Sequence, residues 1–494
     1  MYKRRHASIS THHKKRAIMT PARDRSVDIS EEFLQQCQEE FRSNPANIIA
    51  RNAVTSVGSQ FATTNSNRVN ELNHIFMNTV KKRHLKATNQ GQSGRCWMFA
   101  ALNTFRHVMI KALELENFEF SENYLFFWDK FERCNSYVRW FIDHPDEKPG
   151  SRAYDYMLMD YMCDGGWWNT FANLVNKYGL IPKDCMQETA SSSDSDELNQ
   201  ILKERIDACA NYITNNHHRF SHEELLRIKD DTMKEVYNTL VKFLGEPPET
   251  FSWSFCTDND EGSVVANITP HMFLEMVAPE IDMVKDFVSL AHIPTKDFPL
   301  DSTFRIKYTN NVYEGESCTL YNVSINELAK YAMKSISAGF AVWFVGDVSQ
   351  SFNWYHSALD DELDDHKSVF GETHKFDKGD RISLRNIQGN HAMALTGFNV
   401  DHNGNVVNWQ VENSWGYWDH ETPGMDGFLS MSHSWFKKYV MEVVVHKNFL
   451  SRTLKKRIEV EPIDVDPWDS MAPATRAGVV NPPLKYLNLR RKNN

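Results

Sequence analysis

The sequence predicts an α+β protein, because its two halves differ in the period of their apolar residues. Between about residues 93 and 245, apolar side chains recur at helical spacing. After about residue 335, short segments rich in valine and aromatic residues are bounded by Gly, Asn or Asp, namely "GFAVWFVGDV", "HAMALTGFNV", "NVVNWQVENSW" and "YVMEVVVH". We expect these segments to form a mostly antiparallel sheet, which gives a helical half followed by a β half.

Cap and turn signals divide the helical half. Ser30 can cap the first turn of "SEEFLQQCQEEFRSNP". The loops "HPDEKPGSR" and "ASSSDSDE" separate later helices, and the paired prolines of "LGEPPETFSW" end the helical run. We expect residues 1–28 to form a disordered basic arm, 29–470 the main domain, and 471–494 a C-terminal arm with a basic extension.

Composition and charge exclude several classes of protein. The chain has 494 residues, of which 41% are hydrophobic, and a net charge of -10, so it can bury a large core and carries no overall positive field for nucleic acid. It lacks the run of about 18 apolar residues that a membrane-spanning helix needs. The N-terminus also lacks the apolar stretch of a secretory signal. We expect a cytoplasmic protein, with a mitochondrial presequence as the alternative for the basic N-terminal arm.

Cysteine and histidine spacings predict neither a disulfide framework nor a metal site. Eight cysteines are scattered along the chain without a C-x-x-C pair, which fits a reducing, intracellular compartment. Four histidines lie close together in the sequence but lack a compact ligand pair such as H-x-x-x-H: His356, His366, His374 and His391. We therefore expect no metal site.

The segment "TNQGQSGRCWMFAALNTFR" places a cysteine where a loop becomes a helix. Trp97, Ala101 and Phe105 form one apolar stripe, so Cys96 lies in the first turn of a largely buried helix. The unpaired N–H groups and the dipole of a helix N-terminus favour a thiolate, which is the nucleophilic form. Gln90 carries an amide that can join the backbone N–H of Cys96 in stabilising an oxyanion. The alternative is an inert, buried cysteine.

The motif "NQGQSGRCW" resembles the active-site loop of papain-like cysteine peptidases. The matching residues are Asn89, Gln90, Gly91, Gly94, Cys96 and Trp97. Ser93 stands where the family motif has its first cysteine, which is disulfide-bonded in secreted members, and this loss agrees with a reducing compartment. The motif requires a histidine and an asparagine far along the chain, and "GNHAMALTGF" and "VENSWGYWD" supply His391 and Asn413.

The resemblance implies a role for each of these residues. Cys96 attacks the substrate, and His391 accepts the thiol proton and later protonates the leaving amine. Asn413 fixes the ring tautomer of His391, while Trp415 shields their hydrogen bond from water. Gln90 completes the oxyanion site, and the substrate-binding candidates are Gly94 and, in the C-terminal arm, Arg476.

One departure points to a branch of the family. Papain-like enzymes place the histidine roughly 130–150 residues after the cysteine, whereas His391 follows Cys96 by 295 residues. We therefore expect a large, mainly helical insertion at about 190–335. From about Ser30 to Met471 the chain resembles the bleomycin hydrolase family, with matching segments such as "FEFSENYLFFWDKFERC", "DGGWWNTFANLVNKYGLIPK" and "DGFLSMSHSWFKKYVMEVVV".

The family resemblance implies an intracellular aminopeptidase with a papain-like fold. Such enzymes release N-terminal residues from peptides that have a free N-terminus, through an acyl-enzyme, and also hydrolyse bleomycin-type amides and homocysteine thiolactone. They assemble as homohexamers and need no metal or cofactor. The resemblance also implies that the C-terminal arm lies in the active-site cleft, where a terminal carboxylate meets the substrate ammonium.

The C-terminus departs from the family pattern, which stops near Arg476. This chain continues with "AGVVNPPLKYLNLRRKNN". We favour trimming of this extension. The alternatives are an extension that leaves the cleft by another route, giving an endopeptidase or a weaker aminopeptidase, or a separate binding arm. Two other functions stay open, acyl transfer to an amine at the same site and a hexameric shell that holds nucleic acid on basic arms at 3–25 and 485–492.

Overall fold

The computed structural model describes residues 29–80, 85–372, 377–416 and 427–478. The basic arm predicted at 1–28 and the extension after Gly478 lie outside this part. The chain divides into two compact units. One consists of residues 1–64 and 366–372, and the other of residues 65–365 and 373–494.

The smaller unit consists of short helices. They are α1 (Glu31–Ser43), α2 (Pro45–Val57), α3 (Ser59–Thr63) and α14 (His366–Phe370). Ser30 caps α1, where its hydroxyl accepts the N–H of Phe33 at 3.1 Å. Neither α1 nor α2 has a buried residue, although α1 carries Phe33, Leu34 and Phe41. Both helices therefore expose apolar surface.

The larger unit contains the remaining helices, and most begin at a side-chain cap. The longest are α5 (Cys96–Ala112), α6 (Glu122–Asp143), α8 (Trp168–Tyr178), α10 (Asp196–Asn216), α11 (His222–Leu244) and α13 (Ile325–Ser337). The shorter ones are α4 (Ser66–Glu71), α7 (Arg152–Met159), α9 (Ala190–Ser193), α12 (Pro270–Val277), α15 (Lys378–Ser383), α16 (His433–Tyr439), α17 (Arg452–Arg457) and α18 (Met471–Thr475). Single 3₁₀ turns are η1 (Lys183–Cys185), η2 (His217–Arg219), η3 (Trp354–His356) and η4 (Lys447–Phe449).

A large mixed sheet forms the β half. Its strands are β1 (Asn78–Thr79), β4 (Phe287–Ala291), β5 (Ser302–Ile306), β6 (Thr319–Asn322), β7 (Val342–Gly346), β8 (Phe352–Asn353), β9 (Ala358–Leu359), β10 (His391–Val400), β11 (Val406–Glu412), β12 (Phe428–Ser432), β13 (Val440–His446) and β14 (Ile463–Val465). Their order is β14-β5-β6-β4-β13-β7-β10-β11-β12-β9-β8, with β1 also on β10. Most neighbouring pairs are antiparallel, and β4 with β6, β5 with β14 and β9 with β12 are parallel. The prediction of an α+β fold is confirmed.

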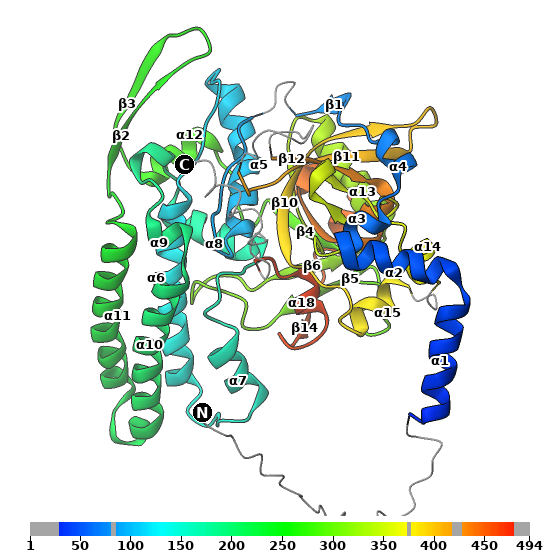
Figure 1. The fold of residues 1–494 in the computed structure, drawn as a ribbon. Helices are drawn as coiled ribbons and strands as arrows, with labels where there is room; N and C mark the ends of the chain where they lie inside the picture. Colours follow the sequence, from blue (N-terminus) through cyan, green and yellow to red (C-terminus); the bar gives the residue numbers. More distant parts are fainter. Residues whose placement is uncertain (1–28, 81–84, 373–376, 417–426, 479–494) are drawn as a thin grey trace, which may run out of the picture. The chain divides into compact units, whose positions relative to one another are not determined.

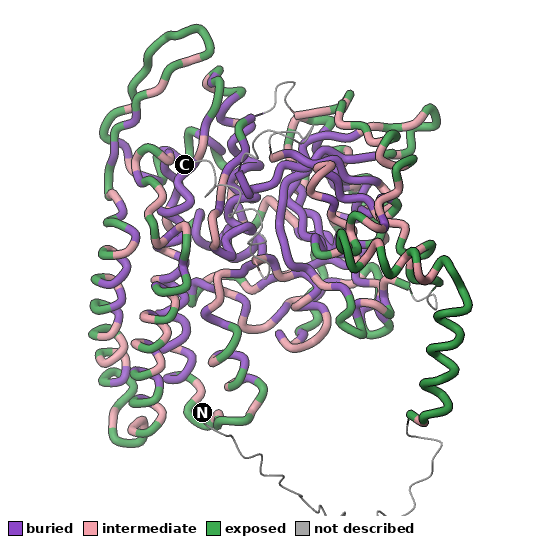
Figure 2. The backbone as a smooth tube through the Cα atoms, in the orientation of Figure 1, coloured by how far each residue is buried: buried purple, intermediate pink, exposed green. Residues whose placement is uncertain are grey.

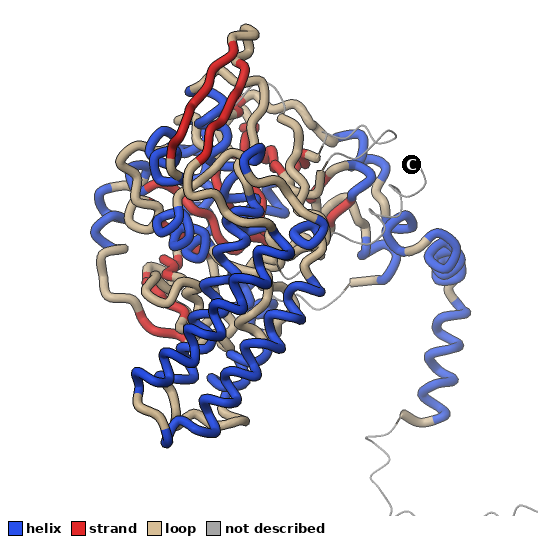
Figure 3. Tube along the Cα trace, turned by 90° about the vertical axis from the view of Figure 1, so that its left-hand side faces the viewer, coloured by secondary structure: helices blue, strands red, loops and turns tan. Residues whose placement is uncertain are grey.

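The range 190–335, predicted as an insertion, contains both helices and strands. Helices α10 and α11 run beside α6 as a long helical layer (Figures 1 and 3). Strands β4, β5 and β6 from the same range join the main sheet. Strands β2 (Phe251–Cys256) and β3 (Gly262–Ile268) instead form a separate hairpin. The range therefore builds part of the main sheet and supplies a helical face.

The sheet and the helical layer each bury a hydrophobic cluster, and α5 and β10 run through the buried interior (Figure 2). Trp343 of β7 donates its indole N–H to the carbonyl oxygen of Trp97 at 3.0 Å. On the far side of α5, Arg106 and His107 both contact the carboxylate of Glu412, the last residue of β11. These contacts place the first turn of α5 against β7, and Arg106 and His107 of the same helix against the end of β11.

Candidate active site

Cys96 is the first residue of α5, as the helical pattern predicted. Its N-cap is Arg95, and the side chain of Cys96 is fully buried. Ala392 is the second residue of β10. Its backbone N–H donates to the Cys96 sulfur at 3.4 Å. The thiol therefore lies directly beside the residue that follows His391.

His391 begins β10, Asn413 directly follows the neighbouring strand β11, and their side chains form a hydrogen bond. The imidazole Nε2 of His391 is 2.8 Å from the side-chain oxygen Oδ1 of Asn413. Oδ1 can only accept, so Nε2 carries the proton and donates. Asn413 is oriented in turn by the N–H of Ser414, which donates to the same oxygen at 2.8 Å. Within the described residues, Nδ1 of His391 has no hydrogen-bond partner and is free to exchange a proton.

Trp415 covers the histidine. The ring centroids of Trp415 and His391 are 4.6 Å apart, and the side chain of Trp415 is 8% exposed. Asn89 and Trp415 form an isolated antiparallel bridge, which joins the loop before Cys96 to the segment after Asn413. The structure therefore brings the sequence-predicted histidine, asparagine and tryptophan into one buried cluster.

Gln90 is held beside the same cluster by its own side chain and by its backbone. Its side-chain oxygen accepts the hydroxyl proton of Ser414 at 2.8 Å, and its backbone N–H donates to the carbonyl of Ser414 at 2.9 Å. Its side-chain amide donates to the carbonyl of Ser93 at 2.7 Å. One of the two amide hydrogens is thus engaged, and the other remains for an oxyanion.

The C-terminal segment lies against the nucleophile. Ala477 and Gly166 exchange both backbone hydrogen bonds, at 2.9 and 3.0 Å, as an added antiparallel strand would. The N–H of Gly478 donates to the carbonyl of Asn390 at 3.2 Å and also contacts the Cys96 thiol. Gly478 has φ +89°, and a Cβ on it would lie 2.1 Å from the carbonyl oxygen of Gly94. Backbone therefore fills the space next to the sulfur.

The two substrate-binding candidates occupy different places. A Cβ on Gly94 would lie 2.6 Å from the carbonyl oxygen of Gly478, so this position needs glycine to admit backbone. The guanidinium of Arg476 points to the end of α7, where it donates to the carbonyl of Asp160 at 3.0 Å and contacts the sulfur of Cys163. Gly94 thus lies against the backbone of the C-terminal segment, whereas Arg476 fastens this segment to the helical half.

Burial controls the charge of the cysteine and the histidine. It raises the pKa of the Cys96 thiol to about 12, although the N–H groups around the sulfur oppose this rise. Burial also lowers the pKa of His391 to about 4, against the opposite effect of its hydrogen bond to Asn413. The N-terminal position in a helix favours an anion by at most about 2 kcal/mol, which desolvation outweighs here. With the C-terminal segment in place, the thiol and the imidazole are both neutral at pH 7.

Sequence reasoning did not find the backbone groups that line the cleft. Asn390 and Gly166 contact the C-terminal segment through backbone carbonyl and N–H groups. Every residue type has such groups, so the sequence does not mark these positions. Asp164 accepts the N–H of Gly94 at 3.2 Å and pairs with Lys130 at 2.6 Å. The sequence feature that could have indicated this region is "DGGWW", because its two glycines permit another backbone segment to approach closely.

Other parts of the described chain show neither a metal centre nor a membrane span. Among the residues that the structure describes, no group of three or more His, Cys, Asp or Glu side chains could hold a metal ion. His374, one of the four clustered histidines, lies outside the described residues. No helix within the described ranges is both long and apolar enough to cross a bilayer.

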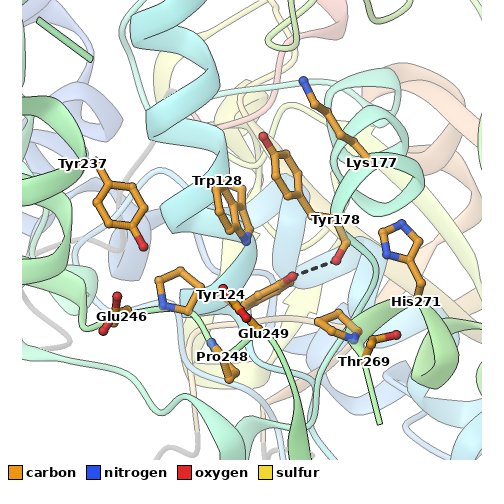
Figure 4. Close-up of a pocket in the computed structure, with 12 residues that line it drawn as sticks. Tyr124, Trp128, Lys177, Tyr178, Tyr237, Glu246, Pro248, Glu249, Thr269 and His271 are labelled. Carbon is orange, nitrogen blue, oxygen red and sulfur yellow. Dashed lines mark hydrogen bonds between the residues drawn. The ribbon is translucent and has the colours of Figure 1, made fainter. Parts of the chain in front are cut away.

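A separate cavity of about 630 Å³ lies on the helical face. Figure 4 shows Trp128 between the rings of Tyr178 and Tyr237, with Glu246 and Glu249 at its rim. The rings of Trp128 and Tyr178 stack at 4.1 Å. None of its lining residues belongs to the cysteine, histidine and asparagine cluster, so it is distinct from the candidate active site.

Comparison with known proteins agrees with the fold. A model of the "Peptidase C1-like family" matches residues 28–472. Aminopeptidase C of Listeria monocytogenes is 35% identical over 90% of this chain and 98% of its own length. Human bleomycin hydrolase is 33% identical over 90% of this chain and 98% of its own length. A crystal structure of PepW from Lactobacillus rhamnosis superposes with a TM-score of 0.86 at 31% identity, covering 90% of this chain and 99% of that one.

The fold is therefore that of a papain-like cysteine peptidase. The chain belongs to the peptidase C1-like family, in the group that contains aminopeptidase C and bleomycin hydrolase, and is a cysteine-type aminopeptidase. The family resemblance inferred from "NQGQSGRCW" and the segments around it is confirmed.

Removing the residues that cover Cys96 should activate its thiol. We expect iodoacetamide to alkylate Cys96 at pH 7 about 10-fold faster in a chain ended at Arg476 than in the full chain, because water reaches the sulfur and its pKa falls toward the ordinary value of about 8.5. The inflection in a plot of alkylation rate against pH should move to lower pH. Mass spectrometry of the peptide carrying Cys96 measures the rate.

A chain ended at Lys485 is the matched control, because it loses residues at the C-terminus but keeps Ala477 and Gly478. It should behave as the full chain does. Intact mass confirms the C-terminus of each chain before alkylation, because trimming would make the three chains alike. Equal rates in chains of confirmed, different lengths would show that the C-terminal segment does not control the thiol.

Proposed function

We propose that Cys96, His391, Asn413 and Gln90 form the catalytic centre of this aminopeptidase. The observation that carries the proposal is the state of His391. Its Nε2 is fixed by Asn413, its Nδ1 has no partner among the described residues, and the N–H of the adjacent Ala392 contacts the Cys96 sulfur. The ring is therefore held with its free nitrogen available for the thiol proton.

The reaction follows from this geometry. Nδ1 of His391 takes the proton from Cys96, and the sulfur attacks the substrate carbonyl carbon. The backbone N–H of Cys96 and the free amide hydrogen of Gln90 stabilise the oxyanion. When the C–N bond breaks, His391 gives its proton to the leaving amine. Water then hydrolyses the thioester, with His391 again as the base, and Trp415 keeps bulk water away from the Asn413 hydrogen bond.

The substrates that we propose are peptides with a free N-terminus. Two kinds of support exist. The relatives are aminopeptidases and bleomycin hydrolases, and the pairing of Ala477 with Gly166 fills one arm of the cleft, which leaves little length for residues before the scissile bond. We extend the proposal to bleomycin-type amides and homocysteine thiolactone, because a thioester intermediate forms equally from an amide or a thiolactone. Gly94 would let a substrate backbone approach, and no metal or cofactor takes part.

Free-amine and N-blocked substrates should separate this function from its alternatives. We expect turnover of aminoacyl fluorogenic substrates, no turnover of their N-acetylated forms, and loss of at least about 1000-fold in Cys96→Ala because the nucleophile is gone. Cys134→Ala, which removes another fully buried thiol, should keep its activity. Equal turnover of blocked peptides would favour an endopeptidase, and product formation that requires an added amine would favour an acyl transferase.

We propose further that the extension beyond about residue 476 is trimmed by the enzyme itself. Gly478 contacts the sulfur, so a chain that continues past it occupies the position that a substrate carbonyl must reach. Cleavage next to Ala477 would open this position. It would also leave a carboxylate on a segment anchored to Gly166, where it could pair with a substrate ammonium.

Intact-mass measurement of the purified protein tests this trimming. The active chain should end between Arg476 and Gly478, whereas Cys96→Ala, expressed and purified in the same way, should retain Asn494. A full-length mass for an active preparation would contradict trimming, and a shortened Cys96→Ala chain would show that another protease cuts it.

We propose a homohexamer in the cytoplasm. The eight cysteines are all free, which suits a reducing compartment. Helices α1 and α2 have no buried residue, and the exposed Phe33 and Phe41 lie two turns apart on α1. An exposed apolar surface of this kind is typical of an interface, and a second copy of this chain would cover it. The net charge of -10 argues against a shell for nucleic acid.

Native mass spectrometry should find a mass six times that of the chain. The double substitution Phe33→Glu and Phe41→Glu should dissociate this assembly, because charged side chains would have to be buried at the contact. Lys111→Glu, an exposed substitution on α5, is the control and should leave the mass unchanged. A monomer at micromolar concentration would contradict the proposal.

A further inference from the structure

A buried ion pair joins the loop before Cys96 to a distant segment of the chain. Arg95 is fully buried, with its guanidinium over the rings of Phe99 and Phe126 at 5.0 and 4.8 Å. Nη1 and Nη2 of Arg95 donate to the two carboxylate oxygens of Glu188, at 3.1 and 2.7 Å. This two-point contact fixes the plane and position of the guanidinium.

The same guanidinium is bonded onward to Gln90. Nε of Arg95 donates to the hydroxyl of Ser93 at 2.8 Å, and this hydroxyl donates to the backbone carbonyl of Gln90 at 2.7 Å. The side-chain amide of Gln90 returns to the carbonyl of Ser93 at 2.7 Å. A chain of hydrogen bonds thus links Glu188, through Arg95 and Ser93, to the side-chain amide of Gln90, so the position of Glu188 affects the position of this amide.

Glu188 is itself held in place. Ser192 donates its hydroxyl to the carboxylate of Glu188 at 2.6 Å. The next residue, Ser193, accepts the backbone N–H of Gln92 at 2.6 Å. Gly91 has φ +64°, and a Cβ there would lie 2.4 Å from the carbonyl oxygen of Ser193. Residues 188–193 thus touch the catalytic loop at a side-chain pair and at the backbone.

The charges of Glu188 and Arg95 favour the ion pair between them. Burial alone would raise the pKa of Glu188, but Arg95 and Ser192 lower it below the usual range for glutamate. Glu188 is therefore ionised when the enzyme is at neutral pH. A neutral amide at this position would keep the shape of the side chain but lose half of the charge pair.

We propose that Glu188 is a positioning residue of the active site, which acts through Arg95 and Ser93 to aim the amide of Gln90 at the oxyanion. The inference rests on the proposed function, because it takes Gln90 as an oxyanion donor. Residues 188–193 restrain this loop by charge and hydrogen bonds. All eight cysteines are free, so the loop has no covalent restraint.

A double-mutant cycle tests whether Glu188 acts through Gln90. We expect Glu188→Gln to lower kcat about 10-fold with little change in KM, and Gln90→Ala to lower kcat about 100-fold, as loss of one oxyanion donor does. The double variant should be no slower than Gln90→Ala, because the amide to be aimed is already absent. Multiplied effects in the double variant would overturn the proposal.

The alkylation rate of Cys96 separates a specific effect on the amide of Gln90 from a general loss of structure, which would change both this rate and kcat. Iodoacetamide reacts with the sulfur without forming an oxyanion, so Glu188→Gln should change the alkylation rate of Cys96 by less than about twofold. A parallel loss of alkylation and kcat would show that Glu188 acts on the thiol instead. If Glu188→Gln does not fold, Arg95→Lys replaces it in the same cycle, because lysine keeps the charge but loses the two-point contact with Glu188 and the Nε–H bond to Ser93.

Asp207→Asn is the matched control. Asp207 pairs with Lys203 on α10 and accepts from Tyr137, away from the catalytic loop. This substitution should lower the thermal midpoint and leave kcat unchanged. If Gln90→Ala has no effect on kcat, the oxyanion assignment fails. If Gln90→Ala is impaired while Glu188→Gln matches the wild type in kcat, only the role of Glu188 fails.

Discussion

The arrangement of the active site depends on the buried carboxylate of Glu412. It is fully enclosed and contacts both Arg106 and His107 of α5. Burial would raise the pKa of Glu412, but these two side chains hold it below the usual range. Leaving one partner of such a pair buried alone costs roughly 3–5 kcal/mol, so the helix and the strand have one favourable register. Because Cys96 begins that helix and Asn413 follows that strand, the contacts of Glu412 with α5 also fix how these two proposed catalytic residues lie relative to each other.

The same enclosure explains why the C-terminal segment matters. A thiol at a helix N-terminus is ordinarily favoured as an anion, yet burial raises the pKa of Cys96, although the N–H groups around the sulfur, that of Gly478 among them, oppose the rise. Solvent access and the charge state of the nucleophile are therefore coupled. A chain end that pairs with Gly166 like an added strand can regulate both at once, without any movement of α5 or β10.

The sequence predicted the residues whose type carries the chemistry. A cysteine after a glycine-containing loop, a histidine that opens a strand and an asparagine that closes the next one each left a local signal, and the structure brings these three together. Glu188 could not be found in this way, since it lies 93 residues from Arg95 and buried ion pairs have no fixed spacing. Gly166 and Asn390 also escaped prediction, because they act through backbone atoms. The sheet itself was expected, but the contribution of residues 190–335 to it was not, because β4, β5 and β6 reach it only through long-range pairing.

The loop before Cys96 contains no disulfide, and its geometry depends on the buried pair of Arg95 and Glu188. A disulfide restrains a loop even when its surroundings are loose, because it also limits the unfolded chain. An ion pair restrains it only where water is excluded and the remaining hydrogen bonds are satisfied. Arg95 meets this condition, since it is enclosed by two aromatic rings and bonded at all three of its nitrogens. The segment at 188–193 supplies the counter-charge, and Phe99 and Phe126 enclose the pair, so a loop without a disulfide can still have a single defined geometry.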